Sequence, residues 1–192
     1  HAVLKSYRKH TVVVEKGDES SSLYVLVSGK VKVYVADEEG KELVLTVLDS
    51  HAHFGELALL GETPRTASVM TLEDSRFLLI SKSDFIACLS GHPDVAFHII
   101  QHLVERVRLL TERVAALGLM DVYGRVVAEL RERAREENGR LITGRLTQQE
   151  LAQVVGSSRE MVSRIFKELR QGGYIEIEHK RIIINRPLPD RW

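Results

Sequence analysis

The chain has 192 residues, of which 44% are hydrophobic and 28% are charged, with 27 Lys or Arg balanced by 27 Asp or Glu. This composition excludes a wholly disordered chain, and no apolar run approaches the roughly 20 residues that cross a bilayer. The single cysteine, Cys88, excludes an internal disulfide and an iron–sulfur cluster held by cysteines of this chain. No signal peptide is visible, and whether residues precede His1 stays open. We expect a cytoplasmic protein that makes no use of a membrane.

Charge is unevenly spread along the chain. Residues 140–192 carry 10 basic and 6 acidic residues, whereas the rest of the chain carries 17 and 21. A mildly basic segment on a mildly acidic body is a weak indication of an anionic partner at the C-terminal end.

Residues 11–81 have the pattern of short strands separated by turns. The stretch KVKVYVADEEGKELVLTVL alternates apolar and polar residues on both sides of Asp37–Gly40, which is typical of a β-hairpin. The stretch ASVMTLEDSRFLLIS shows the same alternation. Many short strands at close spacing predict an antiparallel barrel or sandwich, which we assign to residues 1–93.

After residue 82 the period changes to that of helices. Ser83 is expected to cap a short helix that ends near Leu89, and His92-Pro93-Asp94 opens a long helix over 94–117. Apolar residues recur along it at steps of four and three, which is a heptad pattern and predicts dimerisation. The alternative is a helix that packs only on its own domain. The predicted interface, which begins near Ala96, consists of Ile100, Leu103, Val107, Leu110, Val114 and Leu117.

The segment 118–121 interrupts this pattern and is the predicted hinge. Asp121 is placed to cap a helix over about 122–137, for which Asn138-Gly139 is the expected end. The stretch RLITGRL is expected to form a small strand pair. Residues 122–192 are the predicted second domain, which closes with a hairpin made by YIEIE and RIIIN.

Two short helices within this domain fit a helix-turn-helix. Thr147 to Glu150 is a capping box, and Ser158 is placed to cap the second helix. A helix-turn-helix also needs a small residue where the helices approach, a glycine in the turn and branched residues on the second helix. Ala152, Gly156, Val162 and Ile165 meet these demands.

The second helix begins with charged residues that suit base recognition. Arg159, Glu160 and Arg164 share one broad exposed edge of its first turns. Arginine donates two hydrogen bonds to guanine, and glutamate accepts from cytosine, so the trio suits a site with G·C pairs. The alternative is a solvated helix with an incidental Glu160–Arg164 pair, which leaves the turn geometry unexplained.

The stretch LTQQELAQVVGSSREMVSRIFKELRQGGYI resembles the DNA-binding motif of the cyclic-AMP receptor/FNR family of bacterial transcription regulators. The resemblance implies that the trio reads a TGTGA-like half-site and that a second subunit reads the inverted copy. It also implies RNA polymerase as a partner. The residues that it places at DNA phosphates are Thr147, Gln148, Ser157 and Ser158.

The stretch FGELALLGETPRTASV, residues 54–69, carries a second signal. A Gly-Glu pair on a tight turn can hold a ribose hydroxyl, and an arginine about ten residues on can neutralise a phosphate. The stretch resembles the phosphate-binding cassette of cyclic-nucleotide-binding domains, and KGD and LYVLVSGKVKV are similar to the same barrel. The resemblance implies Gly55 and Glu56 at the ribose, Arg65 and Thr66 at the phosphate, and Leu57 as a further effector-binding residue. The alternative is a barrel that keeps this turn and binds no ligand.

Two departures bear on the ligand. The family reads adenine through two adjacent hydroxyl residues on the long helix, where this chain has Leu110 and Thr111, so Thr111 is the remaining candidate for the base. Cyclic AMP is the first choice, with cyclic GMP and cyclic di-GMP as further candidates. His51 and His53 precede the cassette and His98 and His102 lie on the long helix, but nothing in the sequence brings the pairs together. Surface histidines are therefore the expectation, and no metal site is predicted.

The sequence thus predicts an α+β chain with three parts: an antiparallel cyclic-nucleotide-binding barrel of the jelly-roll type, a dimerisation helix and a winged helix-turn-helix. The predicted function is a homodimeric DNA-binding transcription regulator under the control of a small effector. A DNA-binding regulator whose barrel serves only as a dimerisation scaffold is the alternative. An enzyme is not expected, because no motif places a catalytic set of residues together.

Overall fold

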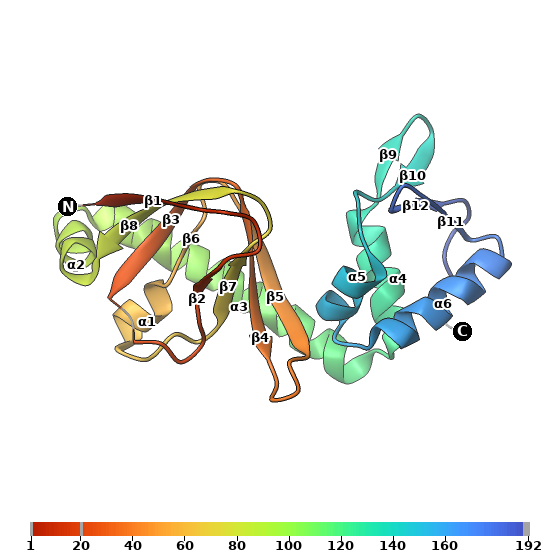
Figure 1. Cartoon of the computed structure of the whole chain (residues 1–192), viewed down its shortest axis with the longest axis horizontal. Coiled ribbons are helices and arrows are strands. Elements are labelled where there is room, and N and C mark those ends of the chain that lie inside the picture. The colour runs from red at the N-terminus through yellow and green to blue at the C-terminus, as the bar shows by residue number, and fades with distance from the viewer. Residues whose placement is uncertain (1, 20, 190–192) are drawn as a thin grey trace. The chain divides into compact units, whose positions relative to one another are not determined.

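The computed structural model describes residues 2–19 and 21–189 (Figure 1). The chain falls into two compact units, one up to Arg108 and the other from Leu109 onwards. The long helix α3 (Pro93–Leu119) runs through this division, so it belongs to both units. Each unit is described by itself below.

Two four-stranded antiparallel sheets form the body of the first unit, which confirms the predicted fold class (Figure 1). One sheet has the order β1 (Val3–Tyr7), β8 (Ser75–Ser81), β3 (Ser22–Ser28) and β6 (His53–Phe54). The other has the order β2 (Val12–Val14), β7 (Ser68–Thr71), β4 (Lys30–Ala36) and β5 (Glu42–Asp49).

Alternation of side chains along these strands builds the core of the barrel. Leu26, Val31 and Phe77 are fully buried, because successive residues of a strand point to opposite faces. The β4–β5 connection is the expected hairpin, in which the Asp37 carboxylate accepts hydrogen bonds from the backbone N–H groups of Glu39 and Lys41 at 3.1 and 2.8 Å.

Two short helices complete the first unit. Helix α1 (Glu56–Gly61) lies within the predicted cassette, and α2 (Lys82–Gly91) follows β8. The cap of α2 differs from the prediction, since the hydroxyl of Ser81 accepts from the backbone N–H of Asp84. Ser83 lies inside the helix, because the helix begins one residue after Ser81.

Helix α3 exposes an apolar stripe that differs in part from the predicted heptad set. Leu103 is half buried, and Ile99 is buried on the same side of the helix. The barrel covers the side of α3 on which Leu103 lies. The most exposed apolar stripe therefore includes Phe97 and Val104, which were not in the predicted set. The stripe residues that are more than half exposed are Phe97, Ile100, Val104, Val107 and Val114.

The second unit packs helices against a small antiparallel sheet of order β11, β12, β10, β9. Its core is a single cluster that includes the fully buried Val126, Leu130, Leu151 and Leu169. The elements are α4 (Val122–Arg133), β9 (Arg135–Glu137), β10 (Arg140–Ile142), α5 (Gln148–Val155), α6 (Arg159–Gln171), β11 (Ile175–Glu178) and β12 (Arg181–Ile184).

Helix α4 ends earlier than the sequence predicted. Asp121 caps its start as expected, accepting from the Gly124 N–H at 2.7 Å. The helix stops at Arg133, however, and Asn138-Gly139 forms the turn between β9 and β10, with φ of 52° and 75°. Asn-Gly is a strong signal for a two-residue hairpin turn as well as for a helix end, and here the hairpin is formed.

Candidate functional site

Local hydrogen bonds fix the helix-turn-helix in the second unit. Thr147 and Glu150 form the expected capping box at the start of α5, and Ser158 caps α6 by accepting from the Met161 N–H at 3.2 Å. Gly156 ends α5 in the left-handed region, with φ of 66° and ψ of 48°. This backbone conformation favours glycine and turns the chain sharply into α6.

The three predicted base-reading residues lie on the outer side of this arrangement. Val162 and Ile165 are buried against the rest of the unit, which leaves Arg159, Glu160 and Arg164 exposed on the opposite side of α6. Within the described part of the chain, no hydrogen bond or ion pair joins these three side chains to another group. Their polar atoms are therefore available to a partner in solution.

The four predicted phosphate-contacting residues lie at the N-terminal ends of α5 and α6. Thr147, Gln148 and Ser157 are half buried, and Ser158 is exposed. The hydroxyls of Thr147 and Ser158 accept bonds from their own helices, but each keeps a proton that it can donate. Helix N-termini favour anions, so both ends suit phosphate oxygens.

Arg125 of α4 contributes a link that sequence reasoning missed. Its guanidinium donates to the backbone carbonyl of Met120, next to the end of α3, at 2.7 Å and to that of Val155, at the end of α5, at 2.8 Å. One side chain therefore joins the predicted hinge to the turn of the helix-turn-helix. Val155 lies 30 residues further along the chain, so this link gives no local signal in the sequence.

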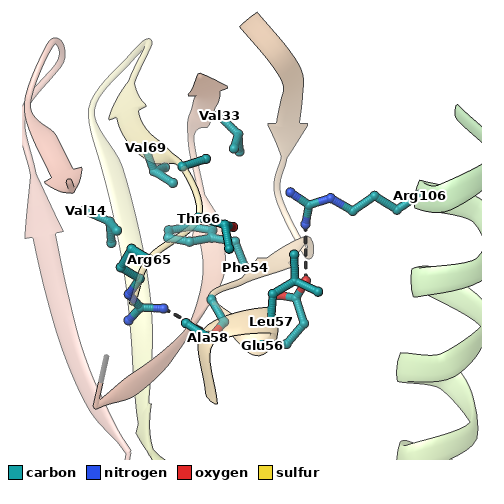
Figure 2. A pocket seen from close by; sticks show the side chains of 12 residues that line it. Val14, Val33, Phe54, Glu56, Leu57, Ala58, Arg65, Thr66, Val69 and Arg106 are labelled. Atoms are coloured by element: carbon teal, nitrogen blue, oxygen red, sulfur yellow. Dashed lines mark hydrogen bonds and ion pairs between the residues drawn. The ribbon is translucent and has the colours of Figure 1, made fainter. Parts of the chain in front are cut away.

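A small cavity in the first unit gathers the cassette residues (Figure 2). Five of the predicted effector residues line it: Gly55, Glu56, Leu57, Arg65 and Thr66. Apolar side chains of the barrel, including those of Val14, Val33, Phe54 and Val69, complete its wall. The free space is about 30 Å³. Thr111, the sixth predicted residue, lies further along α3 in the second unit and stays a prediction.

Arg65 lies across the cavity and holds two backbone carbonyls. Its guanidinium donates to the Gly55 carbonyl at 3.2 Å and to the Ser22 carbonyl at 2.7 Å. Gly55 has φ of 95°, and a Cβ there would meet Nη1 of Arg65 at 2.2 Å, so the close approach requires a glycine. Burial lowers the pKa of Arg65 from its usual value, an effect that Tyr24 and Glu56 oppose.

Glu56 is fully buried and is joined to α3 by an ion pair that the sequence analysis did not predict. Arg106 reaches from α3 and donates to one carboxylate oxygen of Glu56 at 3.2 Å (Figure 2). Arg106 also lines the cavity. The sequence gives no local signal for this pair, because 50 residues separate Arg106 from Glu56.

The prediction that the histidines lie apart on the surface is wrong for His53 and His102. His53 of β6 and His102 of α3 have ring centroids 4.6 Å apart, and both are half buried. His51 and His98 are exposed, as expected. The strand alternation that points Phe54 into the barrel core points His53 outward, where α3 covers it. No group of three or more metal-ligating side chains is found among residues 2–19 and 21–189.

The described helices include none with the length and apolar character needed to cross a bilayer.

Comparison with known proteins decides the family. Residues 4–92 match the cyclic nucleotide-binding domain, and residues 124–187 match the Crp-like helix-turn-helix domain. A CRP-like cAMP-activated global transcriptional regulator of Mycobacterium tuberculosis is 33% identical over 183 residues, which cover 93% of this chain and 81% of the relative. The chain belongs to the CRP/FNR family of transcription regulators.

Further members of the family span nearly the whole chain. The cAMP-activated global transcriptional regulator CRP of Escherichia coli O157:H7 is 30% identical, covering 96% of this chain and 90% of the relative. Among solved structures, the c-di-GMP responsive global regulator CLP of Xanthomonas campestris has a TM-score of 0.87 at 27% identity, covering 96% of this chain and 94% of that one. The Crp-like helix-turn-helix and the curated relatives are those of transcription regulators, a family without enzymatic activity, so this CRP/FNR family member is not an enzyme.

Proposed function

We propose that this CRP/FNR regulator is a cytoplasmic homodimer that reads a TGTGA-like inverted repeat when a cyclic nucleotide occupies its barrel. Cyclic AMP is the first candidate, because the relatives from M. tuberculosis and E. coli are described as cAMP-activated. Cyclic di-GMP remains a candidate because the Xanthomonas regulator responds to it. RNA polymerase is the proposed partner at the promoter.

The exposed trio on α6 carries the proposal for DNA recognition. Arg159, Glu160 and Arg164 project from a helix whose N-terminus is capped and whose opposite face is buried. Such a helix can enter the major groove with its first turns, where arginine pairs with guanine and glutamate with cytosine. Thr147, Gln148, Ser157 and Ser158 would then fix its register on the phosphates.

The buried charges of the cassette support the proposal for the effector. Glu56 has the acceptor that a ribose hydroxyl needs, and Arg65 has the donors that a cyclic phosphate needs. Arg106 connects Glu56 to α3, which gives an effector a direct contact with the helix that leads to the second unit.

The exposed stripe of α3 supports dimerisation through this helix. Apolar side chains at heptad spacing would be removed from water when they pack against the same helix of a second copy. We keep residues 94–117 as the proposed dimerisation helix, 118–121 as the hinge and 122–192 as the DNA-binding domain. Recognition helices of such a dimer would contact half-sites about 34 Å apart, one turn of DNA.

Fluorescence anisotropy with a labelled duplex tests the proposal. The duplex carries the TGTGA inverted repeat, a scrambled duplex is the control, and both are titrated at one salt concentration with and without cyclic AMP, cyclic GMP or cyclic di-GMP. We expect one nucleotide to strengthen binding to the repeat at least fivefold, with little effect on the scrambled duplex. Equal binding to both duplexes under every condition would refute DNA recognition by the trio.

A second candidate is a regulator that binds DNA without an effector. It is favoured by the closed cassette, since Arg65 already bonds two backbone carbonyls and the cavity holds about 30 Å³. If this candidate is right, the protein binds the repeat with the same affinity in the absence of nucleotide and in the presence of each of the three nucleotides.

A further inference from the structure

A cluster of unpaired polar atoms lies beside the proposed effector site. Among the described residues, three buried side-chain atoms have no hydrogen-bond partner, namely Nε2 of His53, Oε2 of Glu56 and Nδ1 of His102. Buried polar groups without a partner cost free energy and are rare in folded proteins. The three belong to residues that already interact, through the ring contact of His53 with His102 and the electrostatic effect of Glu56 on His53.

The charged groups around His53 come from two helices. Helix α1 supplies Glu56, and α3 supplies His102 and Arg106, one turn apart. The residue that pairs with His53 on β3 is the uncharged Val25. Burial has the largest effect on His53 and lowers its pKa, Glu56 opposes this effect, and His102 and Arg106 add to it.

Two charged residues that line the cavity, Glu56 and Arg106, act electrostatically on His53, which lies beside the cavity lining. With Glu56 ionised, Arg65 and Arg106 leave the cavity with one net positive charge. A proton on the histidine pair would add a second positive charge in a half-buried place. An anionic effector cancels one positive charge and so makes the same proton easier to bind.

We propose that His53 and His102 bind one proton between them when an anionic effector fills the cavity, and that this proton strengthens effector binding. The proposal rests on the proposed effector function and adds a pH dependence to it. The bound proton adds a positive charge that the Glu56 carboxylate attracts, while Arg106 continues to hold one of the carboxylate oxygens. Effector and proton then assist each other by the same free energy.

The sign of the effect follows from linkage. If the effector raises the pKa of His53, the affinity for the effector increases as pH falls through that raised pKa and levels off below the pKa of His53 in the free protein. Each unit by which effector binding raises this pKa corresponds to a tenfold increase in affinity at low pH. We expect the affinity for cyclic AMP to rise about threefold to tenfold between pH 8 and pH 5.5, a range in which its phosphodiester stays singly ionised.

Two measurements test the proposal on the intact chain. Calorimetry gives the affinity for cyclic AMP, cyclic GMP and cyclic di-GMP against pH, and NMR follows the imidazole resonances with and without saturating nucleotide. His53→Gln and His102→Gln should each flatten the pH dependence. His98→Gln is the matched control, because His98 is exposed on α3 one turn before His102, and it should keep the full dependence.

The outcomes separate this proposal from the effector proposal. A nucleotide that binds equally well at all pH values, with unchanged histidine titration, overturns the proton site and leaves the effector function intact. If none of the three nucleotides binds at any pH, the proposed effector function is refuted and the coupling with it. NMR of the unmodified protein needs no variant, so a failure of His53→Gln to fold does not affect this test.

Discussion

The arginines of this protein differ in whether the fold already supplies hydrogen-bond partners for their side chains. The exposed arginines of α6 have polar atoms that no described group uses, whereas Arg65 and Arg106 already hold partners inside the first unit. We therefore expect the exposed arginines of α6 to contribute to binding a partner, and Arg65 and Arg106 to contribute to both folding and binding.

Base reading by Arg159 can be tested by truncation. We expect Arg159→Ala to cost about 1–3 kcal/mol on the TGTGA repeat and to relax the preference for guanine at one position, because a bidentate contact is lost. Anisotropy on the repeat and on single-base variants measures both effects. Arg170→Ala is the control, since Arg170 is exposed in the last turn of the same helix and should leave base preference unchanged. Equal losses on repeat and scrambled duplexes would contradict the assigned role.

Arg65 is the residue to test for effector binding. Arg65→Gln should weaken cyclic nucleotide binding by roughly 10-fold to 100-fold, because a hydrogen bond to a charged group contributes about 1.5–3 kcal/mol. Calorimetry measures the affinity, and Arg76→Gln on the exposed side of β8 serves as the control. A thermal scan identifies any loss of folding, since Arg65 also holds the Gly55 and Ser22 carbonyls.

The half-buried position of His53 predicts that acid destabilises the nucleotide-free first unit. Burial lowers the pKa of His53, an effect that Glu56 opposes and that His102 and Arg106 add to, so the unfolded chain binds the proton more readily than the folded one. Stability is then fully present above the unfolded pKa of about 6.5 and falls as pH drops toward the lower folded pKa. Urea unfolding between pH 7.5 and pH 5 measures this slope. His53→Gln should make it shallower, and an unchanged slope would contradict the argument.

At the scale of elements, caps and turns fix where helices begin and end. Asp121, the last residue of the proposed hinge, caps α4, and Gly156 shapes the turn between α5 and α6. These signals act within a few residues, so the folded chain keeps them whatever the units do relative to each other.

The cap at Asp121 can be tested by comparing two substitutions. Asp121→Ala should lower the unfolding free energy of the second unit by about 1 kcal/mol, because the Gly124 N–H loses its partner. Asp121→Asn should retain most of that free energy, since asparagine is an equally good cap. Urea unfolding followed by circular dichroism measures both, and equal losses would show that the charge, rather than the cap, stabilises the helix start.

At the scale of the whole molecule, the proposed mechanism requires two copies. A charge in the middle of the exposed stripe of α3 should prevent their association. Val104→Glu is expected to weaken the dimer by about 3 kcal/mol or more per buried charge, and the folded monomer tolerates it because Val104 is 64% exposed. Sedimentation velocity measures whether the protein is a dimer or a monomer. His98→Glu, at an exposed position of the same helix with no stripe residue three or four positions away, should leave the dimer intact. A dimeric Val104→Glu variant would refute the interface.

Signals carried by neighbouring residues allowed much of this fold to be predicted from the sequence. Strand alternation gave the antiparallel sheets, the capping box gave α5, and the spacing of Ala152, Gly156, Val162 and Ile165 gave the helix-turn-helix. The cassette sequence also gave five residues that line one cavity. Each of these depends on contacts or conformations within a few positions of the chain, which a sequence displays directly.

Tertiary structure alone decided which side of α3 the barrel covers. That choice pairs Glu56 with Arg106, brings His53 to His102, half buries Leu103 and leaves Val104 exposed. It also decided that Asn138-Gly139 turns a hairpin rather than ending a helix, because β10 pairs with β12 as well as with β9. These contacts join residues that lie far apart in the chain, and their free energy depends on the packing of the whole unit.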